Sequence, residues 1–388
     1  MQVTKVRILL FALIALQCAN ASSADELAQG VAAFEKADYA AAHGWLMAAA
    51  ETGDTRAASW LGADYYIGWG VAPDKRLADL WIEQAKSEPG ASDVEAALSQ
   101  WRRLADSGDA AGQVMLGVAY ERGLGVTASP VEAFKWYRLA ADQGHARGQY
   151  SIGAMYANGT GVKRDAKEAL KWLQLAAAQG DTWAQYEIGG SYLLGDGVRR
   201  NLKIAGQWLT QAAVAGNAFA QYNLGVMYDQ GDGFRQDYAE AFKWYQLAAA
   251  QGVSDAQNNL AALYYRGQGT ARDVGTAFQF STLAHNQVSL GGPGGQHHFD
   301  FAYRTIQQDL SEGDRRTAVF HLGERCRDGA GVPRDAVQAY RYMQVSIQDE
   351  TDEQLKATRL KSLDDLAALM SPAQVSRAQA LAATTEQP

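Results

Sequence analysis

The side chains best able to do chemistry in this sequence are one cysteine and a late group of histidines. Cys326 is the only cysteine beyond residue 21, and His285, His297, His298 and His321 all lie in the last third of the chain. The sequence contains no H-E-x-x-H metal motif and no S-x-x-K or G-x-S-x-G nucleophile motif. No carboxylate spacing completes a metal site beside His297 and His298. We therefore predict a protein that is not an enzyme and that carries no metal or other cofactor.

A glycine that recurs every 36 residues sets the frame in which any functional side chain must be placed. It occurs at Gly108, Gly144, Gly180, Gly216 and Gly252, and Gly53 begins an earlier copy. Self-similarity at such a period is typical of a solenoid, in which each unit buries its apolar face only against its neighbours. We therefore expect one array of helical repeats rather than several separate globular domains.

The first half of each unit predicts a helix with one apolar stripe. Position 8 after the turn glycine carries Leu61, Leu116, Ile152, Ile188, Leu224 and Leu260; position 9 carries Gly62, Gly117, Gly153, Gly189, Gly225 and Ala261; position 12 carries Tyr65, Tyr120, Tyr156, Tyr192, Tyr228 and Tyr264. These spacings place the three positions on one helical face. A glycine inside a helix costs about 1 kcal/mol relative to alanine, so its recurrence indicates that a second helix passes close by. Cys326 takes the tyrosine position of a last unit, which predicts a buried thiol.

A paired glycine follows each of these predicted helices. The pairs are Gly123 and Gly125, Gly159 and Gly161, Gly195 and Gly197, Gly231 and Gly233, and Gly267 and Gly269. A phosphate-binding loop would need a preceding strand and a longer glycine pattern, and neither is present. We interpret the pairs as helix stops, because glycine adopts left-handed backbone angles that other residues resist.

The second half of each unit predicts another helix with a stripe of alanines and a tryptophan. Ala133, Trp136, Ala140 and Ala141 are followed at the same spacing by copies that contain Trp172, Trp208 and Trp244. Small residues let helices approach closely, and we expect the tryptophans to fill the core between them. The alternative is that the tryptophans form a ladder on which a ligand stacks.

The complete pattern resembles that of the Sel-one-like repeat (SLR) family, a relative of the tetratricopeptide repeats. It is clearest in residues 220–228, in Gly231-Asp232-Gly233 and in residues 241–249, and it covers roughly residues 53–346 with interruptions. The resemblance implies an all-α fold, a right-handed α/α superhelical solenoid of helix pairs. Some cysteine-rich members act on β-lactams and close each repeat with a disulfide, but this chain lacks those cysteines, so the resemblance does not carry that activity over.

Breaks in the pattern predict the divisions of the chain. We expect a signal peptide at 1–21, a degenerate N-terminal helix-pair cap at 22–52, the SLR array at 53–290 with an extra helix at 93–107, a Gly/Pro/His linker at 291–299, a final divergent repeat at 300–348, and C-terminal capping helices and a tail at 349–388. Ser371-Pro372-Ala373-Gln374 has the form of a helix start, with a capping serine and glutamine.

The N-terminus and the charge restrict where the protein acts and what it binds. Lys5 and Arg7 precede a short apolar run and an A-x-A cleavage site at Ala19–Ala21, which predicts a periplasmic or secreted protein without a transmembrane span. The formal net charge is −8. That charge argues against nucleic acid or an anionic membrane surface as the partner.

Off the packing stripe, the first helices carry a row of aromatic and amide side chains. In tetratricopeptide-like solenoids the first helices line the concave face, so the family resemblance implies a partner-binding groove there. The predicted binding residues are Tyr150, Trp183, Tyr186, Phe219, Tyr222, Asn223, Asn258 and Asn259. Such a surface suits an extended peptide or a sugar chain. The alternative is that the tyrosines only pack against the next repeat.

Three functions fit the sequence. The first is a non-catalytic scaffold or regulator that binds a protein or extended peptide along the groove, as the family resemblance implies. The second is a binder of peptidoglycan or polysaccharide, because an aromatic row also suits glycans. The third, a β-lactam or cell-wall-peptide hydrolase, depends on the family resemblance alone.

Overall fold

The structure is a computed structural model that describes residues 23–35, 39–51, 54–67, 81, 91–289, 304–348 and 350–383. The predicted signal peptide at 1–21 and linker at 291–299 lie outside the described residues. The chain divides into two compact units, Met1–Ala184 and Gln185–Pro388, and each is described by itself. All regular secondary structure in the described residues is helical. The predicted all-helical solenoid of paired helices is confirmed.

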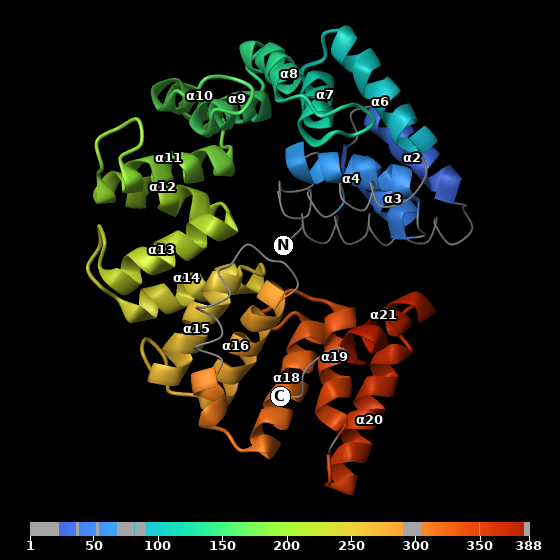
Figure 1. Ribbon diagram of the computed structural model, residues 1–388, viewed down its shortest axis with the longest axis vertical. Coiled ribbons are helices and arrows are strands. Elements are labelled where there is room, and N and C mark those ends of the chain that lie inside the picture. The colour runs from blue at the N-terminus through green and yellow to red at the C-terminus, as the bar shows by residue number, and fades with distance from the viewer. Residues whose placement is uncertain are drawn as a thin grey trace, which may run out of the picture. The chain divides into compact units, whose positions relative to one another are not determined.

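In the first unit, consecutive helices pack side by side (Figure 1). They are α2 (Ser23–Glu35), α3 (Tyr39–Glu51), α4 (Thr55–Ile67), α6 (Ala91–Asp106), α7 (Ala110–Arg122), α8 (Pro130–Asp142), α9 (Ala146–Asn158) and α10 (Ala166–Ala178). A single apolar cluster runs through α2–α9, and the rings of Trp60 and Trp101 meet edge to face within it. Each helix therefore buries its stripe against neighbours in the stack.

The second unit continues the same alternation of first and second helices. Its helices are α11 (Thr182–Leu194), which begins just before the division, α12 (Leu202–Val214), α13 (Ala218–Gln230), α14 (Tyr238–Ala250), α15 (Ser254–Arg266), α16 (Val274–Ser289), α18 (Glu312–Asp328), α19 (Ala336–Ile347), α20 (Glu353–Ala367) and α21 (Pro372–Ala383). Apolar clusters connect α12 with α13, and α14 with the helices that follow it. Cys326 lies in the second of these clusters with 2% of its surface exposed, which confirms the predicted burial.

The helix ends show both predicted and further capping. Second helices begin at acceptor side chains, which the sequence analysis did not identify: Oδ1 of Asp165 accepts from the backbone N–H of Lys167 at 3.0 Å and of Glu168 at 3.1 Å. First helices end at the first glycine of each pair, as at Gly159, where φ is 71°. The capping box at Ser371 is also present, because the backbone N–H of Gln374 donates to Ser371 and the Gln374 side chain accepts from the backbone N–H of Ser371.

In five of the described repeats the two helices pack most closely where the first helix carries a glycine. A methyl group at Gly225 would lie 2.6 Å from Cδ1 of Tyr245, and one at Gly189 would lie 2.7 Å from Cγ of Leu209. The same close approach recurs between Gly117 and Tyr137, Gly153 and Leu173, and Gly323 and Met343. The glycine is therefore required because a large side chain of the second helix occupies the space that a Cβ would need.

We predicted that the tryptophans fill the core between the two helices of a repeat. This prediction was wrong, because other residues occupy the space beside the glycines. Trp172, Trp208 and Trp244 are only partly buried, whereas the residue that follows each of them is buried. The physical reason is the register of the second helix. The residue that points at the glycine inside the first helix lies twenty positions after that glycine, as Leu173 does after Gly153, and the tryptophan lies one residue earlier. Trp172 packs at the edge of the core, with the Arg138 guanidinium 4.9 Å from its ring centre.

A recurring pair of glutamines, here called the glutamine ladder, joins the start of the first helix to the end of the second helix within a repeat. The side chain of Gln143 donates to Oε1 of Gln113 at 2.7 Å, and that of Gln179 donates to Oε1 of Gln149 at 2.8 Å. The same bond joins Gln251 to Gln221 at 2.8 Å. In the repeat between the Gln179 and Gln251 pairs, Ala215 replaces the donor, and Oε1 of Gln185 is buried without a hydrogen-bond partner in the described chain. A buried acceptor without a partner is unfavourable.

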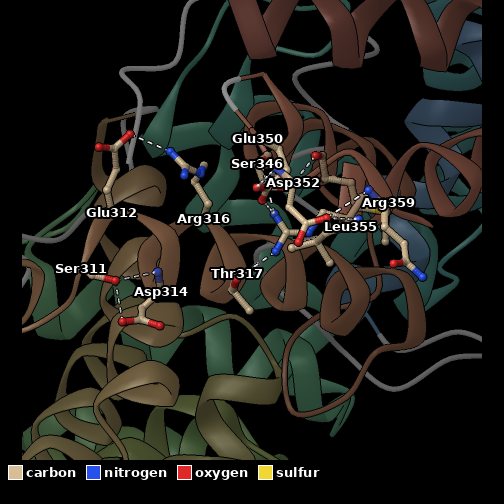
Figure 2. Close-up of polar contacts among 12 residues, drawn as sticks. Ser311, Glu312, Asp314, Arg316, Thr317, Ser346, Glu350, Asp352, Leu355 and Arg359 are labelled. Carbon is tan, nitrogen blue, oxygen red and sulfur yellow. Dashed lines mark hydrogen bonds and ion pairs between the residues drawn. The ribbon is translucent and has the colours of Figure 1, made fainter. Parts of the chain in front are cut away.

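A buried arginine joins the C-terminal helices (Figure 2). The guanidinium of Arg359 on α20 donates to Glu350 at 2.8 Å, to the backbone carbonyl of Ser346 at 3.3 Å and to Thr317 on α18 at 2.9 Å. It also lies 5.1 Å from the ring centre of Phe320. Arg359 and Glu350 are almost completely buried, so each compensates the other's loss of water. This contact connects α20 with α18.

Two adjacent glycines of α11 give a matched test of the close approach. Gly189→Ala should lower the free energy of unfolding by about 1–3 kcal/mol because its Cβ overlaps Leu209. Gly190→Ala should raise it by up to about 1 kcal/mol, because no described atom lies within 4 Å of the added methyl and alanine favours the helix. Urea unfolding followed by far-ultraviolet circular dichroism measures both. Equal effects of the two substitutions would contradict the packing described above.

Restoring the missing glutamine should stabilise the protein. In Ala215→Gln the new side chain can donate to Oε1 of Gln185, since the backbone at Ala215 (φ −76°, ψ 2°) resembles that at Gln251 (φ −89°, ψ 2°). The expected gain is about 1 kcal/mol, seen as a higher thermal midpoint. Val214→Gln, at the neighbouring exposed position, is the control and should leave the midpoint nearly unchanged. A midpoint for Ala215→Gln no higher than that of the control would contradict the ladder.

Candidate functional site

Six of the eight predicted binding residues lie on three successive first helices of the second unit. Tyr186 is on α11; Phe219, Tyr222 and Asn223 are on α13; Asn258 and Asn259 are on α15. Together with Glu187 on α11, we call these residues the first-helix face. The other two predicted residues, Tyr150 on α9 and Trp183 at the start of α11, belong to the first unit.

An asparagine of the following repeat lies beside each tyrosine of the first-helix face. Asn223 is close enough to Tyr186 to lower the pKa of its hydroxyl, and Asn259 acts in the same way on Tyr222. Burial raises the pKa of both tyrosines, and the negative charges of Glu187 and Asp255 raise the pKa of Tyr186 and Tyr222 respectively. Both hydroxyls therefore stay protonated at neutral pH.

Phe219 is the most exposed ring of the first-helix face. It has 37% of its surface exposed, and its ring centre lies 6.2 Å from that of Tyr186 at an interplanar angle of 48°. The ring of Tyr222 in turn lies 6.1 Å from that of Tyr245, whose hydroxyl donates to Asp229 at 3.2 Å. The face thus presents the exposed ring of Phe219 next to Tyr186, and the ring of Tyr222 packs on the hydrogen-bonded Tyr245.

The remaining predicted binding residues in this comparison, Tyr150, Trp183 and Asn258, are less exposed than Phe219. Tyr150 has only 7% of its surface exposed, and the Arg147 guanidinium lies 4.9 Å from its ring centre. Tyr150 therefore offers little contact surface to a partner. Trp183 is half-buried. Asn258 takes the position that Tyr186 and Tyr222 hold in the preceding repeats, and its Oδ1 is buried without a hydrogen-bond partner among the described atoms.

Sequence reasoning missed Glu187. This residue stands at the position that Asn223 and Asn259 hold in the next two repeats, and it is half-buried. Burial raises the pKa of its carboxyl group. The available signal was a carboxylate at a position where the following two repeats carry an amide, but the sequence alone does not show whether another side chain compensates that charge.

A buried histidine–aspartate pair was also missed. Nδ1 of His43 on α3 lies 3.1 Å from Oδ2 of Asp64 on α4, and the His43 ring meets the Tyr65 ring edge to face at 5.3 Å. Burial raises the pKa of Asp64 to about 6. The pair connects two adjacent helices within the N-terminal core, where both side chains are inaccessible to a substrate.

One hollow lies outside the first-helix face. It has a volume of about 610 Å³ and is lined by Tyr228 and by residues 234–238. Its aromatic wall is explained by packing: the Phe234 ring stacks on Tyr228 at 4.5 Å and fills the space left by Gly206, where a methyl group would lie 2.7 Å from that ring. We therefore assign this hollow to packing between repeats.

The described residues offer no evident machinery for chemistry. They include no group of three or more His, Cys, Asp or Glu side chains that could hold a metal ion. Burial raises the pKa of Cys326 to about 12, which makes its thiolate scarce at neutral pH. In the same part of the chain, no helix combines the length and apolar character that crossing a membrane requires.

Comparison with known proteins agrees with this architecture. The family model described as "Sel1 repeat" matches residues 55–88, 110–145, 146–181, 184–217, 218–253, 254–286 and 317–348. No curated protein sequence matches the chain.

Two solved structures illustrate the likeness. A Sel1 repeat protein from Oxalobacter formigenes is 25% identical, with a TM-score of 0.50, and the match covers 77% of this chain and 90% of that chain. A protective antigen present in uropathogenic Escherichia coli strains, described as displaying an SLR fold, is also 25% identical; that match covers 96% of this chain and 93% of the antigen with a TM-score of 0.38.

Proposed function

Because this chain belongs to the Sel1 repeat family, we propose that it is a non-catalytic scaffold that holds an extended segment of a partner protein against its first-helix face. Sel1 repeats form scaffolds typical of protein-binding bacterial proteins. The partner would be held by shape and side chains, without a covalent step. The signal sequence expected at residues 1–21 supports a partner in the periplasm or outside the cell.

The observation that carries this proposal is the exposed ring of Phe219 on a preorganised surface. Aromatic side chains dominate the energetics of protein interfaces when they are supported by well-packed neighbours. Here the neighbouring ring is that of Tyr186, which is partly buried and lies beside Asn223 of the next repeat. A surface that is already ordered loses little conformational entropy when a partner binds. Trp183 and Tyr150 stay predicted contacts on the first unit.

Photocrosslinking in living cells tests the proposal. The photoreactive residue p-benzoyl-phenylalanine replaces Phe219 in one variant and Leu247 in a control variant. Leu247 is 49% exposed on the second helix α14. Irradiation of the Phe219 variant should yield a discrete crosslinked protein that mass spectrometry identifies, and the Leu247 variant should not yield it.

Two results would contradict the proposal. The first is an absence of crosslinked protein from position 219, and the second is the same products from both positions. Sedimentation of the wild-type protein with purified cell-wall material, lost on Phe219→Ala, together with no crosslinked protein, would instead support a glycan binder.

A further inference from the structure

The glutamine ladder has a gap in the second unit, at the end of α12. Gln143, Gln179 and Gln251 each donate to the glutamine thirty residues earlier in the chain, at 2.7–2.8 Å. Ala215 stands at the donor position of the repeat formed by α11 and α12, and its side chain has no N–H to give. The acceptor, Oε1 of Gln185, is buried and has no hydrogen-bond partner among the described residues. A buried acceptor without a donor is unfavourable, so this repeat gains a bond when a donor comes from another molecule.

The backbone around the gap is the same as in the repeats where the bond is made. Gly189 of α11 meets Leu209 of α12, in the same contact that joins the two helices of each intact pair. At Ala215 the backbone angles φ and ψ are −76° and 2°, and at Gln251 they are −89° and 2°. Ala215 therefore lies where a donor glutamine begins in the other repeats. The space between it and Gln185 is the space that such a side chain would occupy.

The turn that carries Ala215 is open to solvent. Val214 has 73% of its surface exposed, and Ala215 and Gly216 are exposed as well. A methyl group added at Gly216 would meet no described atom within 4 Å. A side chain of another molecule can therefore enter beside Ala215 and take the route toward Gln185 that the donor glutamine takes in the other repeats.

The gap adjoins the exposed ring of the first-helix face. Phe219 comes four residues after Ala215, near the start of α13, and has 37% of its surface exposed. The Phe219 ring lies 6.2 Å from the ring of Tyr186, which follows Gln185 on α11. A partner segment that packs an apolar residue on Phe219 thus has the gap within reach of a neighbouring side chain.

We propose that the partner segment places an asparagine or glutamine side chain in this gap, where its amide donates to Oε1 of Gln185, while an adjacent apolar residue packs on Phe219. An amide suits the gap because the other repeats fill the same space with the amide of a glutamine. A segment without a donor at this point leaves the Gln185 oxygen unpaired and binds more weakly. This inference rests on the proposed function, since it names a side chain of the segment held by the first-helix face.

Two matched peptides test this inference. The first probe is a fluorescein-labelled, N-acetylated and C-amidated peptide of repeated serine-leucine-glutamine units. The second probe carries methionine sulfoxide in place of every glutamine. Methionine sulfoxide is neutral and of similar length, and it keeps an oxygen acceptor but has no N–H donor. Fluorescence anisotropy with the full-length mature protein should show that the glutamine peptide binds about tenfold more tightly than the sulfoxide peptide.

One substitution closes the gap with the protein's own donor. Ala215→Gln should bind the glutamine peptide about tenfold more weakly than the wild-type protein does, and no more tightly than it binds the sulfoxide peptide. Its thermal midpoint should be higher than that of the wild-type protein, so unfolding does not explain the lost affinity. Val214→Gln adds the same side chain at the neighbouring exposed position and should leave both affinities nearly unchanged. Circular dichroism checks that each variant is folded.

Several results would overturn the inference. Equal affinity of the wild-type protein for the two peptides is one, and failure of the glutamine peptide to bind is another. An unchanged affinity of Ala215→Gln for the glutamine peptide, or equal weakening by Ala215→Gln and Val214→Gln, would overturn it as well. In each of those cases crosslinking from position 219 still decides the proposed function independently.

Discussion

The close approach of two helices at a glycine is the constraint on which the rest of this structure depends. In the central repeats the first helix carries a glycine, for example Gly189 or Gly225. A large residue of the second helix then occupies the space that a side chain at this position would need. This contact fixes the rotation of the first helix about its own axis. The same rotation sets the direction of the other side chains of that helix; Tyr222, three residues before Gly225, meets the same Tyr245 ring. The first-helix face is a direct consequence of this orientation.

Much of the fold could be predicted from the sequence because the repeat is strict. The turn glycines, the glycine pairs and the capping box at Ser371 depend on local backbone chemistry, which short-range patterns record well. The burial pattern of the second helix was harder. Trp172 and Leu173 are both apolar and adjacent, so periodicity alone could not show that Leu173 meets Gly153. Only the packing of two helices decides between neighbouring positions.

The helix positions of the candidate-site residues could be predicted from the sequence, but their burial and their contacts with other repeats could not. Tyr186, Tyr222 and Phe219 could be placed on the first helices by counting from the turn glycine. The closeness of Asn223 and Asn259 to these tyrosines depends on the repeat that follows, which a single-helix pattern does not describe. The half-burial of Glu187 likewise depends on the helices packed around it.

The most direct test of the central constraint is a double-mutant cycle on one helix pair. Residues Ala261 and Ser281 take the positions of Gly225 and Tyr245 in the next repeat, so a small residue there accompanies an added methyl group. Gly225→Ala should cost about 1–3 kcal/mol of unfolding free energy in the wild-type protein and almost nothing in Tyr245→Ser, as measured by urea unfolding. The same cost in both backgrounds would contradict the account, since the glycine would then serve some purpose other than admitting the large side chain.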